Sequence, residues 1–157
     1  MEIRLFQKDD TQQVEQLLQD SVNIVDTEGQ TQTSTKRWNA NNPEITNWEA
    51  LFLNKFTIVS EIKDTIVGIA QIEDTGHISC FFCHPKFRRQ GIGGQLYSAL
   101  EDYARSKNIP TIYTECSDTD RPFYLQMEFD IVQKQKVLVD GEVPIYYIVK
   151  KDLHYEQ

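Results

Sequence analysis

A basic, glycine-rich segment, Arg88-Arg89-Gln90-Gly91-Ile92-Gly93-Gly94, is the part of this sequence best suited to binding an anion. It follows an apolar run of strand length, Ile78 to Cys83, which His84-Pro85 ends because proline has no N–H to give to a strand ladder. Apolar residues then recur at helical spacing. The N–H groups of a first helical turn attract phosphate, glycines let the ligand approach the backbone, and arginines add paired donors. This order of strand, glycine turn and helix predicts a phosphate site.

Two common phosphate-binding patterns do not fit this segment. A Lys-Ser/Thr pair does not follow the last glycine, and the glycine spacing differs from the dinucleotide fingerprint. The remaining pattern, Arg88-x-x-Gly91-x-Gly93, resembles the acyl-CoA pyrophosphate loop of the GNAT superfamily of N-acyltransferases, whose pattern is Gln/Arg-x-x-Gly-x-Gly/Ala. The resemblance implies that this segment binds the pyrophosphate of acetyl-CoA as a cosubstrate.

A second segment, from Ser117 to Phe129, resembles the part of the same family that follows its fifth strand. Ser117, Phe123 and Tyr124 fall on positions of that motif. The family's tyrosine lies near the CoA sulfur, so the resemblance makes Tyr124 a candidate general acid; packing as a half-buried aromatic residue is the alternative. Glu128 departs from the pattern, because the family usually has glycine there. If the turn needs a positive φ, glutamate costs roughly 1 kcal/mol relative to glycine.

The resemblance also implies a gap between the strand at Ile78–Cys83 and the strand that starts at Thr111, into which pantetheine inserts. The backbone near Phe82 and Cys83 would then bind the pantetheine amides and polarise the thioester carbonyl. The resemblance makes Ser117 and Phe123 further candidates for binding the cosubstrate.

Direct transfer to an amine needs a base or a water relay, since a primary amine is mostly protonated at neutral pH. Glu115, which precedes Ser117 on a strand expected to face the gap, is the first candidate; a solvated or structurally paired carboxylate is the alternative for this residue. Three residues of neighbouring strands are alternatives: Glu73, Glu61 and His77. The last of these is expected to be a surface histidine at the start of a strand. Two tryptophans of the N-terminal region are candidates for the acceptor pocket, Trp38 and Trp48.

Cys80-x-x-Cys83 followed by His84 invites a zinc or redox interpretation. A second pair of ligands is missing from the sequence, and side chains three residues apart on a strand point to opposite faces. Cys80, Cys83 and Cys116 are therefore expected to be reduced structural thiols, and no metal site is predicted.

Composition limits the classes of partner. The chain has 157 residues and a formal net charge of −8, which disfavours nucleic acid and favours a small cationic acceptor over a protein. Neither an apolar stretch of membrane-spanning length nor a secretion signal is found in the sequence, so no membrane association and a cytoplasmic location are expected. A monomer and a homodimer both remain open.

The hydrophobic periodicities predict a strand at Ile3–Phe6, followed by a helix capped by Asp10 and Gln13. The remaining predicted elements are a short helix at Trp48–Leu53, strands at Phe56–Ile62, Ile66–Ile72, His77–Cys83 and Thr111–Cys116, a helix that runs to about Lys107, a short helix at Arg121–Met127, and a hairpin of Ile131–Val139 and Val143–Lys150 around Asp140-Gly141.

These elements and the resemblance imply one α/β (α+β) domain over residues 1–157. Its expected architecture is a mixed, mostly antiparallel sheet splayed in the middle, with helices on both faces and a C-terminal β-hairpin. The expected function is N-acetyl transfer from acetyl-CoA to a primary amine in a ternary complex. A non-catalytic acyl-CoA sensor or structural module is the alternative.

Overall fold

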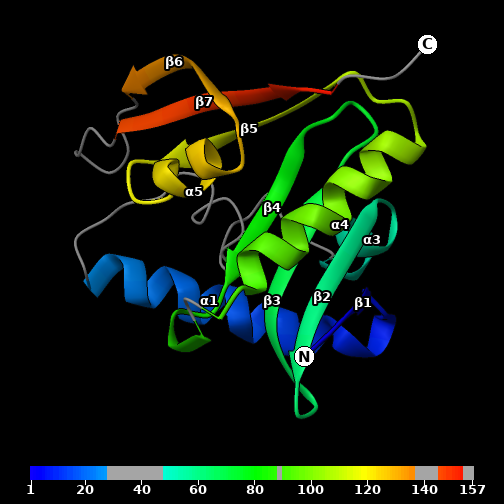
Figure 1. Cartoon of the computed structure of the whole chain (residues 1–157). Coiled ribbons are helices and arrows are strands. Elements are labelled where there is room, and N and C mark those ends of the chain that lie inside the picture. The colour runs from blue at the N-terminus through cyan, green and yellow to red at the C-terminus, as the bar shows by residue number, and fades with distance from the viewer. Residues whose placement is uncertain (28–47, 88–89, 137–144, 154–157) are drawn as a thin grey trace.

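The computed structural model describes residues 1–27, 48–87, 90–136 and 145–153. Figure 1 shows two sheets that meet along one side, with helices on both faces of the larger sheet. In chain order the elements are β1 (Glu2–Leu5), the 3-10 turn η1 (Lys8–Asp10), α1 (Thr11–Thr27), α3 (Trp48–Leu53), β2 (Phe56–Ile62), β3 (Thr65–Ile72), β4 (Ile78–Cys83), the 3-10 turn η2 (Pro85–Phe87), α4 (Ile92–Ser106), β5 (Thr111–Ser117), α5 (Arg121–Gln126), β6 (Asp130–Lys136) and β7 (Ile145–Asp152).

The predicted helix at Trp48–Leu53 and the predicted strand at Phe56–Ile62 have the observed bounds. The other predicted elements differ by one or two residues at their ends within the described part of the chain. The turn predicted at Asp140-Gly141 lies outside the described residues.

Both sheets are antiparallel. The first has the strand order β1-β2-β3-β4 and the second has the order β5-β7-β6, so β4 and β5 are edge strands that face each other. They are joined by a parallel bridge between His77 and Tyr113, and Tyr113 N–H donates to the Gly76 carbonyl at 3.0 Å. Gly76 has a φ of 98°, and a Cβ there would lie 2.0 Å from the Thr111 carbonyl oxygen. Glycine at this position therefore lets the two sheets approach.

The core has two parts, one on each face of the first sheet. On one face α4 contributes Ile92, Leu96, Leu100 and Ala104, which are fully or almost fully buried against β3, β5 and β7. On the other face α1 contributes Val14, Leu17 and Leu18, which pack with α3 against Val59 and Ile69. β3 is covered on both faces, which explains its nearly continuous apolar sequence.

The predicted capping box of Asp10 and Gln13 is wrong. The Asp10 carboxylate instead accepts hydrogen bonds from the Arg4 guanidinium at 2.7 and 2.9 Å and from Gln7 N–H at 2.8 Å. Gln13 Oε1 accepts from Ile66 N–H at 3.2 Å. Asp10 thus binds a guanidinium and Gln13 binds a backbone N–H of β3, and both are stronger partners than the backbone N–H groups at the start of a helix. The two side chains therefore join the start of α1 to the sheet.

Among the helices of the described residues, none is long and apolar enough to span a membrane.

Candidate active site

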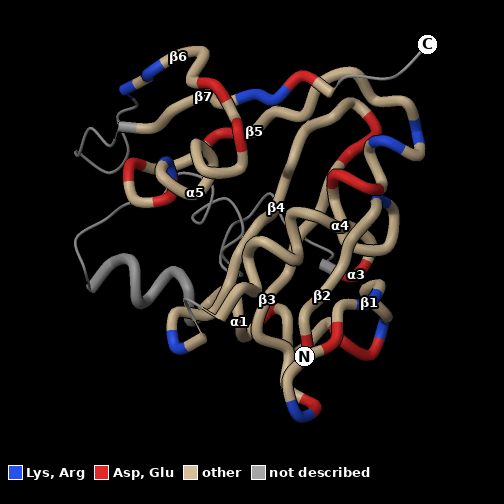
Figure 2. The backbone as a smooth tube through the Cα atoms, viewed as in Figure 1, with Lys and Arg blue, Asp and Glu red and all other residues tan. Residues whose placement is uncertain are grey.

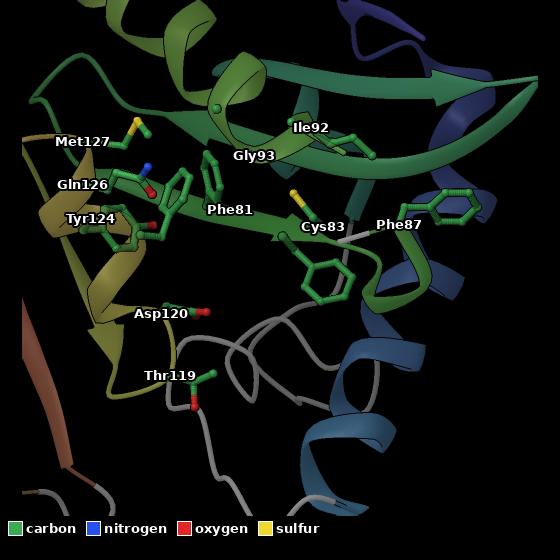
Figure 3. Close-up of a pocket in the computed structure, with 14 residues that line it drawn as sticks. Phe81, Cys83, Phe87, Ile92, Gly93, Thr119, Asp120, Tyr124, Gln126 and Met127 are labelled. Carbon is green, nitrogen blue, oxygen red and sulfur yellow. The ribbon is translucent and has the colours of Figure 1, made fainter. Parts of the chain in front are cut away.

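A pocket of about 550 Å³ opens between the end of β4, the start of α4 and α5. We call it the β4–α5 pocket, and Figure 3 shows its lining. Its walls are mainly aromatic and glycine residues, with a few polar side chains from α5 and the turn before it. The lining residues are Phe81, Phe82, Cys83, Phe87, Gly91, Ile92, Gly93, Gly94, Thr119, Asp120, Phe123, Tyr124, Gln126 and Met127.

The glycine segment forms the first turn of α4 at one side of this pocket. Gly91 is the N-cap residue and has a φ of 78°, a left-handed conformation that favours glycine. Its carbonyl accepts from Gln95 N–H at 3.1 Å, which starts the helix. The N–H groups of Ile92, Gly93 and Gly94 belong to the helical turn that has no carbonyl partners within the helix. These backbone donors and the helix dipole make this side of the pocket suited to a phosphate.

Two predicted cosubstrate contacts from this segment, Arg88 and Arg89, lie outside the described residues. Gln90 is exposed and is not among the residues that line the pocket. The predicted contacts from β4, Phe82 and Cys83, do line it.

Tyr124, the candidate general acid, and Phe123, a candidate cosubstrate contact, both line the pocket from α5. Tyr124 is only 5% exposed and its ring packs edge-on against Phe81, Phe123 and Phe129. Burial raises the pKa of its phenol well above the usual value, and the negative charge of Asp120 adds to this effect. Within the described residues its hydroxyl makes no hydrogen bond, so it is a neutral donor at the pocket wall.

Ser117 lies at the end of β5 but is not among the lining residues. Its Oγ accepts a hydrogen bond from Asp120 N–H at 3.2 Å and so shapes the turn that leads into α5. Through this hydrogen bond, Ser117 helps to position α5.

Sequence reasoning missed six lining residues. Four of them share a strand face or a helix turn with residues that were predicted, so the periodicity of a strand or a helix could have indicated them: Phe81, Asp120, Gln126 and Met127. Phe81 is two residues from Cys83 on one strand face, and Asp120 is one helical turn before Tyr124. The other two, Phe87 and Thr119, lie in short connections that carry no periodic signal.

A network of Glu73, His77 and Glu115 lies beside the bridge between the sheets. His77 Nε2 lies 2.7 Å from a Glu115 carboxylate oxygen, and Nδ1 lies 3.2 Å from a Glu73 oxygen. The Glu73 carboxylate also pairs with Lys55. Glu115 is the most exposed of the three, since 43% of its side chain is accessible, and it does not line the β4–α5 pocket.

The expectation that His77 is a surface histidine is wrong. The residue is 8% exposed, because its ring stacks on Tyr113 at 5.1 Å between centroids and its two nitrogens face carboxylates. Burial alone lowers the pKa of its imidazole, but hydrogen bonds and charge from Glu115 and then Glu73 outweigh burial, so the pKa lies above its usual value. The two carboxylates therefore favour the protonated form of the ring.

The network and the pocket lie on opposite faces of β5. Cys116 belongs to the core beneath α4 and α5, together with Ile112, whereas Tyr113 and Glu115 alternate with them along the strand. Glu115 thus lies beside the contact of β4 and β5, on the face away from Tyr124.

The third candidate base, Glu61, lies elsewhere. It pairs with Arg4 at 2.6 Å and is opposite Ile66, at the far end of the β2–β3 pair from Glu73. Trp38 lies outside the described residues, and Trp48 begins α3.

The three cysteines are reduced thiols and lie on two faces of the sheets. Cys80 belongs to the core under α1, whereas Cys116 and Cys83 belong to the core under α4. Burial raises the pKa of the Cys116 thiol to about 12. In the part of the chain that the structure describes, no group of three or more His, Cys, Asp and Glu side chains is arranged to hold a metal ion.

Comparison with known proteins agrees with this architecture. The profile of the family described as "Acetyltransferase (GNAT) domain" matches residues 26–144, about three quarters of the chain. The chain therefore belongs to the GNAT acetyltransferase family. A search of curated protein sequences finds no match.

Solved structures show the same fold at low sequence identity. A GCN5-related N-acetyltransferase from Rhodopseudomonas palustris has a TM-score of 0.82 and 19% identity over 97% of this chain and 95% of that one. The putative acetyltransferase yncA from Salmonella typhimurium, solved with acetyl-CoA, has a TM-score of 0.77 and 16% identity over 100% and 96%. The PaiA N-acetyltransferase from Thermoplasma acidophilum, solved with coenzyme A, has a TM-score of 0.74 and 15% identity over 97% and 98%.

Proposed function

We propose that this GNAT acetyltransferase transfers an acetyl group from acetyl-CoA to a primary amine, directly and within a ternary complex. One observation carries the proposal: a single pocket has the first turn of α4 on one side and the Tyr124 phenol on another. The first feature suits a diphosphate and the second suits a leaving thiolate. Family membership and two neighbours solved with acetyl-CoA or coenzyme A support this choice of donor.

The residues of the pocket fit such a donor. The α4 N–H groups from Ile92 to Gly94 would hold the pyrophosphate, and Gly91 adds no side chain that would block it. Phe81 and Phe123, whose ring centroids lie 5.4 Å apart, would pack on the apolar part of pantetheine. The edge of β4 at Phe82 and Cys83 offers backbone groups for the pantetheine amides and a donor for the thioester oxygen.

In the proposed reaction a bond forms between the amine nitrogen and the acetyl carbon, and the bond from that carbon to sulfur breaks. Tyr124 gives its proton to the departing sulfur and recovers one from solvent. Glu115 accepts a proton from the ammonium form of the amine before the attack, and the attacking nitrogen loses a second proton to solvent as the amide forms, which balances the proton that Tyr124 recovers. The products are an N-substituted acetamide, CoA as the thiol, and the proton that the ammonium ion gave up.

The raised pKa of Tyr124 is compatible with this acid role. A phenol whose pKa is raised by burial stays protonated at neutral pH and is ready to donate. The same desolvation would raise the pKa of the CoA thiol in this pocket. The departing thiolate is therefore a stronger base than in water, just as the Tyr124 phenol is a weaker acid. Transfer between the two groups thus remains possible despite the shift.

The placement of Glu115 supports a base on the acceptor side. Its carboxylate lies beside the contact of β4 and β5 but on the face away from Tyr124, so proton removal and proton donation would occur on opposite sides of the transferred group. His77 fixes one carboxylate oxygen at 2.7 Å, and the exposed part of the side chain remains accessible.

The test has two measurements on the full chain. Calorimetric titration with CoA measures donor binding, and release of free thiol from acetyl-CoA with a pool of small primary amines measures transfer. Binding together with amine-dependent thiol release supports the proposal. Binding without any release indicates an acyl-CoA sensor, and absence of CoA binding rejects both.

A further inference from the structure

Asp120 is the one charged side chain among the described residues that line the β4–α5 pocket. The other lining residues are glycine, apolar, aromatic or neutral polar. Asp120 is partly exposed, and Figure 3 shows its side chain pointing from the turn before α5 into the open centre of the view. A carboxylate at the wall of a largely apolar pocket gives one part of that pocket a preference for cations.

Asp120 lies away from the glycine turn and close to the phenol. In Figure 3, Asp120 and Thr119 lie below β4, whereas Ile92 and Gly93 lie above it. Tyr124 follows Asp120 by one helical turn, and its N–H points to the Asp120 carbonyl at 3.4 Å. The Asp120 charge is also the largest effect on the pKa of Tyr124 after burial. The carboxylate is therefore on the side of the pocket where the transfer would occur.

The charge at this position has consequences for both substrates. It repels the diphosphate of an acyl-CoA, which reinforces the orientation with the phosphates at α4. It attracts a cation that enters beside Tyr124. The nitrogen that attacks the thioester must be neutral, so it cannot be the group that keeps a lasting ion pair with Asp120.

From these observations, and resting on the acetyl transfer proposed above, we propose that Asp120 selects acceptors that carry a second positive charge. The acceptor class is then a small aliphatic diamine or a related polyamine-like molecule. One nitrogen forms an ion pair with Asp120, and the other loses its proton and accepts the acetyl group. The net charge of −8 adds a general attraction for such molecules.

The variant that tests this is Asp120→Asn, which removes the charge and keeps the shape. The Asp120 side chain makes no capping hydrogen bond to α5, and its backbone N–H and carbonyl bonds to Ser117, Phe123 and Tyr124 are kept in asparagine. Asp118→Asn is a matched control. Asp118 has the same charge in the same turn, but it faces Arg121 and Tyr147, is 66% exposed and does not line the pocket.

The probes are 1,4-diaminobutane and butylamine, which have the same chain and differ by one ammonium group. Each is titrated by calorimetry into the complex of the protein with CoA, and acetylation rates are measured with acetyl-CoA. We expect the parent and Asp118→Asn to bind the diamine more tightly than butylamine. In Asp120→Asn the diamine should bind roughly 10- to 100-fold more weakly, with butylamine changed by no more than about twofold.

The remaining outcomes separate this inference from the proposed function. Equal diamine affinity in the parent and Asp120→Asn overturns the role of Asp120. CoA binding by the parent without any diamine binding overturns the acceptor class and leaves the donor assignment standing. A parent that does not bind CoA rejects the proposed function itself, and the inference falls with it.

Discussion

The His77 imidazole and the Glu115 carboxylate lie 2.7 Å apart, although they come from the two different sheets. The contact stands beside the bridge of His77 with Tyr113, where β4 and β5 approach each other. Because Glu73, the residue after β3, faces the other ring nitrogen at 3.2 Å, the imidazole lies between carboxylates from both sides of this contact. The charges that orient the proposed base therefore also hold the sheets together. In Figure 2, charged residues also lie at turns, along α4 and on β6 and β7.

Stability should depend on pH through His77. Its pKa is raised in the folded state, so its contribution is fully present below the unfolded value near 6.5 and is lost as pH rises through the folded value. We expect the melting temperature of the parent to exceed that of His77→Gln most at about pH 6, and the difference to shrink toward about pH 9. Thermal unfolding followed by circular dichroism at several pH values measures this.

Glu115→Gln is the control for that experiment, because it removes the main charge partner and keeps the size of the side chain. Its pH dependence between the same limits should be weaker than that of the parent. A difference between the parent and His77→Gln that stays constant across the range would mean that folding does not raise the pKa of the ring.

Glu115→Gln should also lower the rate of acetyl transfer if Glu115 is the base. General bases contribute roughly 100- to 10,000-fold, so we expect kcat to fall by about that factor at neutral pH. The loss should diminish at high pH, where more of the acceptor amine is neutral without help. Steady-state rates with a fixed amine between pH 7 and 10 measure this, and CoA affinity should be unchanged. A constant loss across the range would indicate a role other than proton removal.

The sequence predicted well what depends on neighbouring residues. The bounds of most elements, the presence of a helix after the glycine turn and the placing of Tyr124 and Phe123 on α5 all follow from local periodicity and turn chemistry. The resemblance to the GNAT family, carried by two short motifs, then predicted the fold, and the family profile confirms it.

What the sequence did not predict depends on residues far apart in the chain. His77 and Glu115 are separated by 38 positions, and only the approach of the two sheets buries the histidine and places it beside this carboxylate. Arg4 likewise forms ion pairs with both Asp10 and Glu61. Asp10 therefore does not cap α1 as predicted, and Glu61, one of the candidate bases, is engaged in an ion pair away from the pocket. Pairings of this kind depend on strand order, which a single sequence does not specify.

Gly91 offers a matched pair of variants for the donor site. Asparagine and aspartate both tolerate its positive φ better than most residues, have the same size and differ by one charge. A Cβ at this position meets nothing within 4 Å, so both side chains have room, and the backbone strain at this φ is shared by the two variants. If the pyrophosphate binds here, Gly91→Asp should lose roughly tenfold more CoA affinity than Gly91→Asn, by calorimetry. Equal losses would place the phosphates elsewhere.

Glu128 is predicted to strain the turn after α5. Its φ is 72°, and this turn closes the helix through Phe129 N–H, which donates to the Tyr124 carbonyl at 3.0 Å. Glu128→Gly should therefore raise the free energy of unfolding by about 0.5 to 1 kcal/mol in urea titrations. Glu128→Ala is the control, because it also removes the carboxylate near Lys151 but keeps the Cβ. A gain of the same size in both variants would assign it to the charge instead of the backbone.

The decisive variant for the proposed chemistry is Tyr124→Phe, which removes the hydroxyl and keeps the ring in its cluster with Phe81 and Phe129. Since the hydroxyl makes no hydrogen bond within the described residues, its loss should change the melting temperature and the CoA affinity little. A thiol with a pKa near 8.5 is a tolerable leaving group without help, so we expect kcat to fall by roughly 10- to 1000-fold, or about 1.4 to 4 kcal/mol. Single-turnover rates at saturating amine isolate the chemical step from product release. An undiminished rate would show that water or another group protonates the sulfur, whereas a fall in stability matching the fall in rate would assign Tyr124 a packing role.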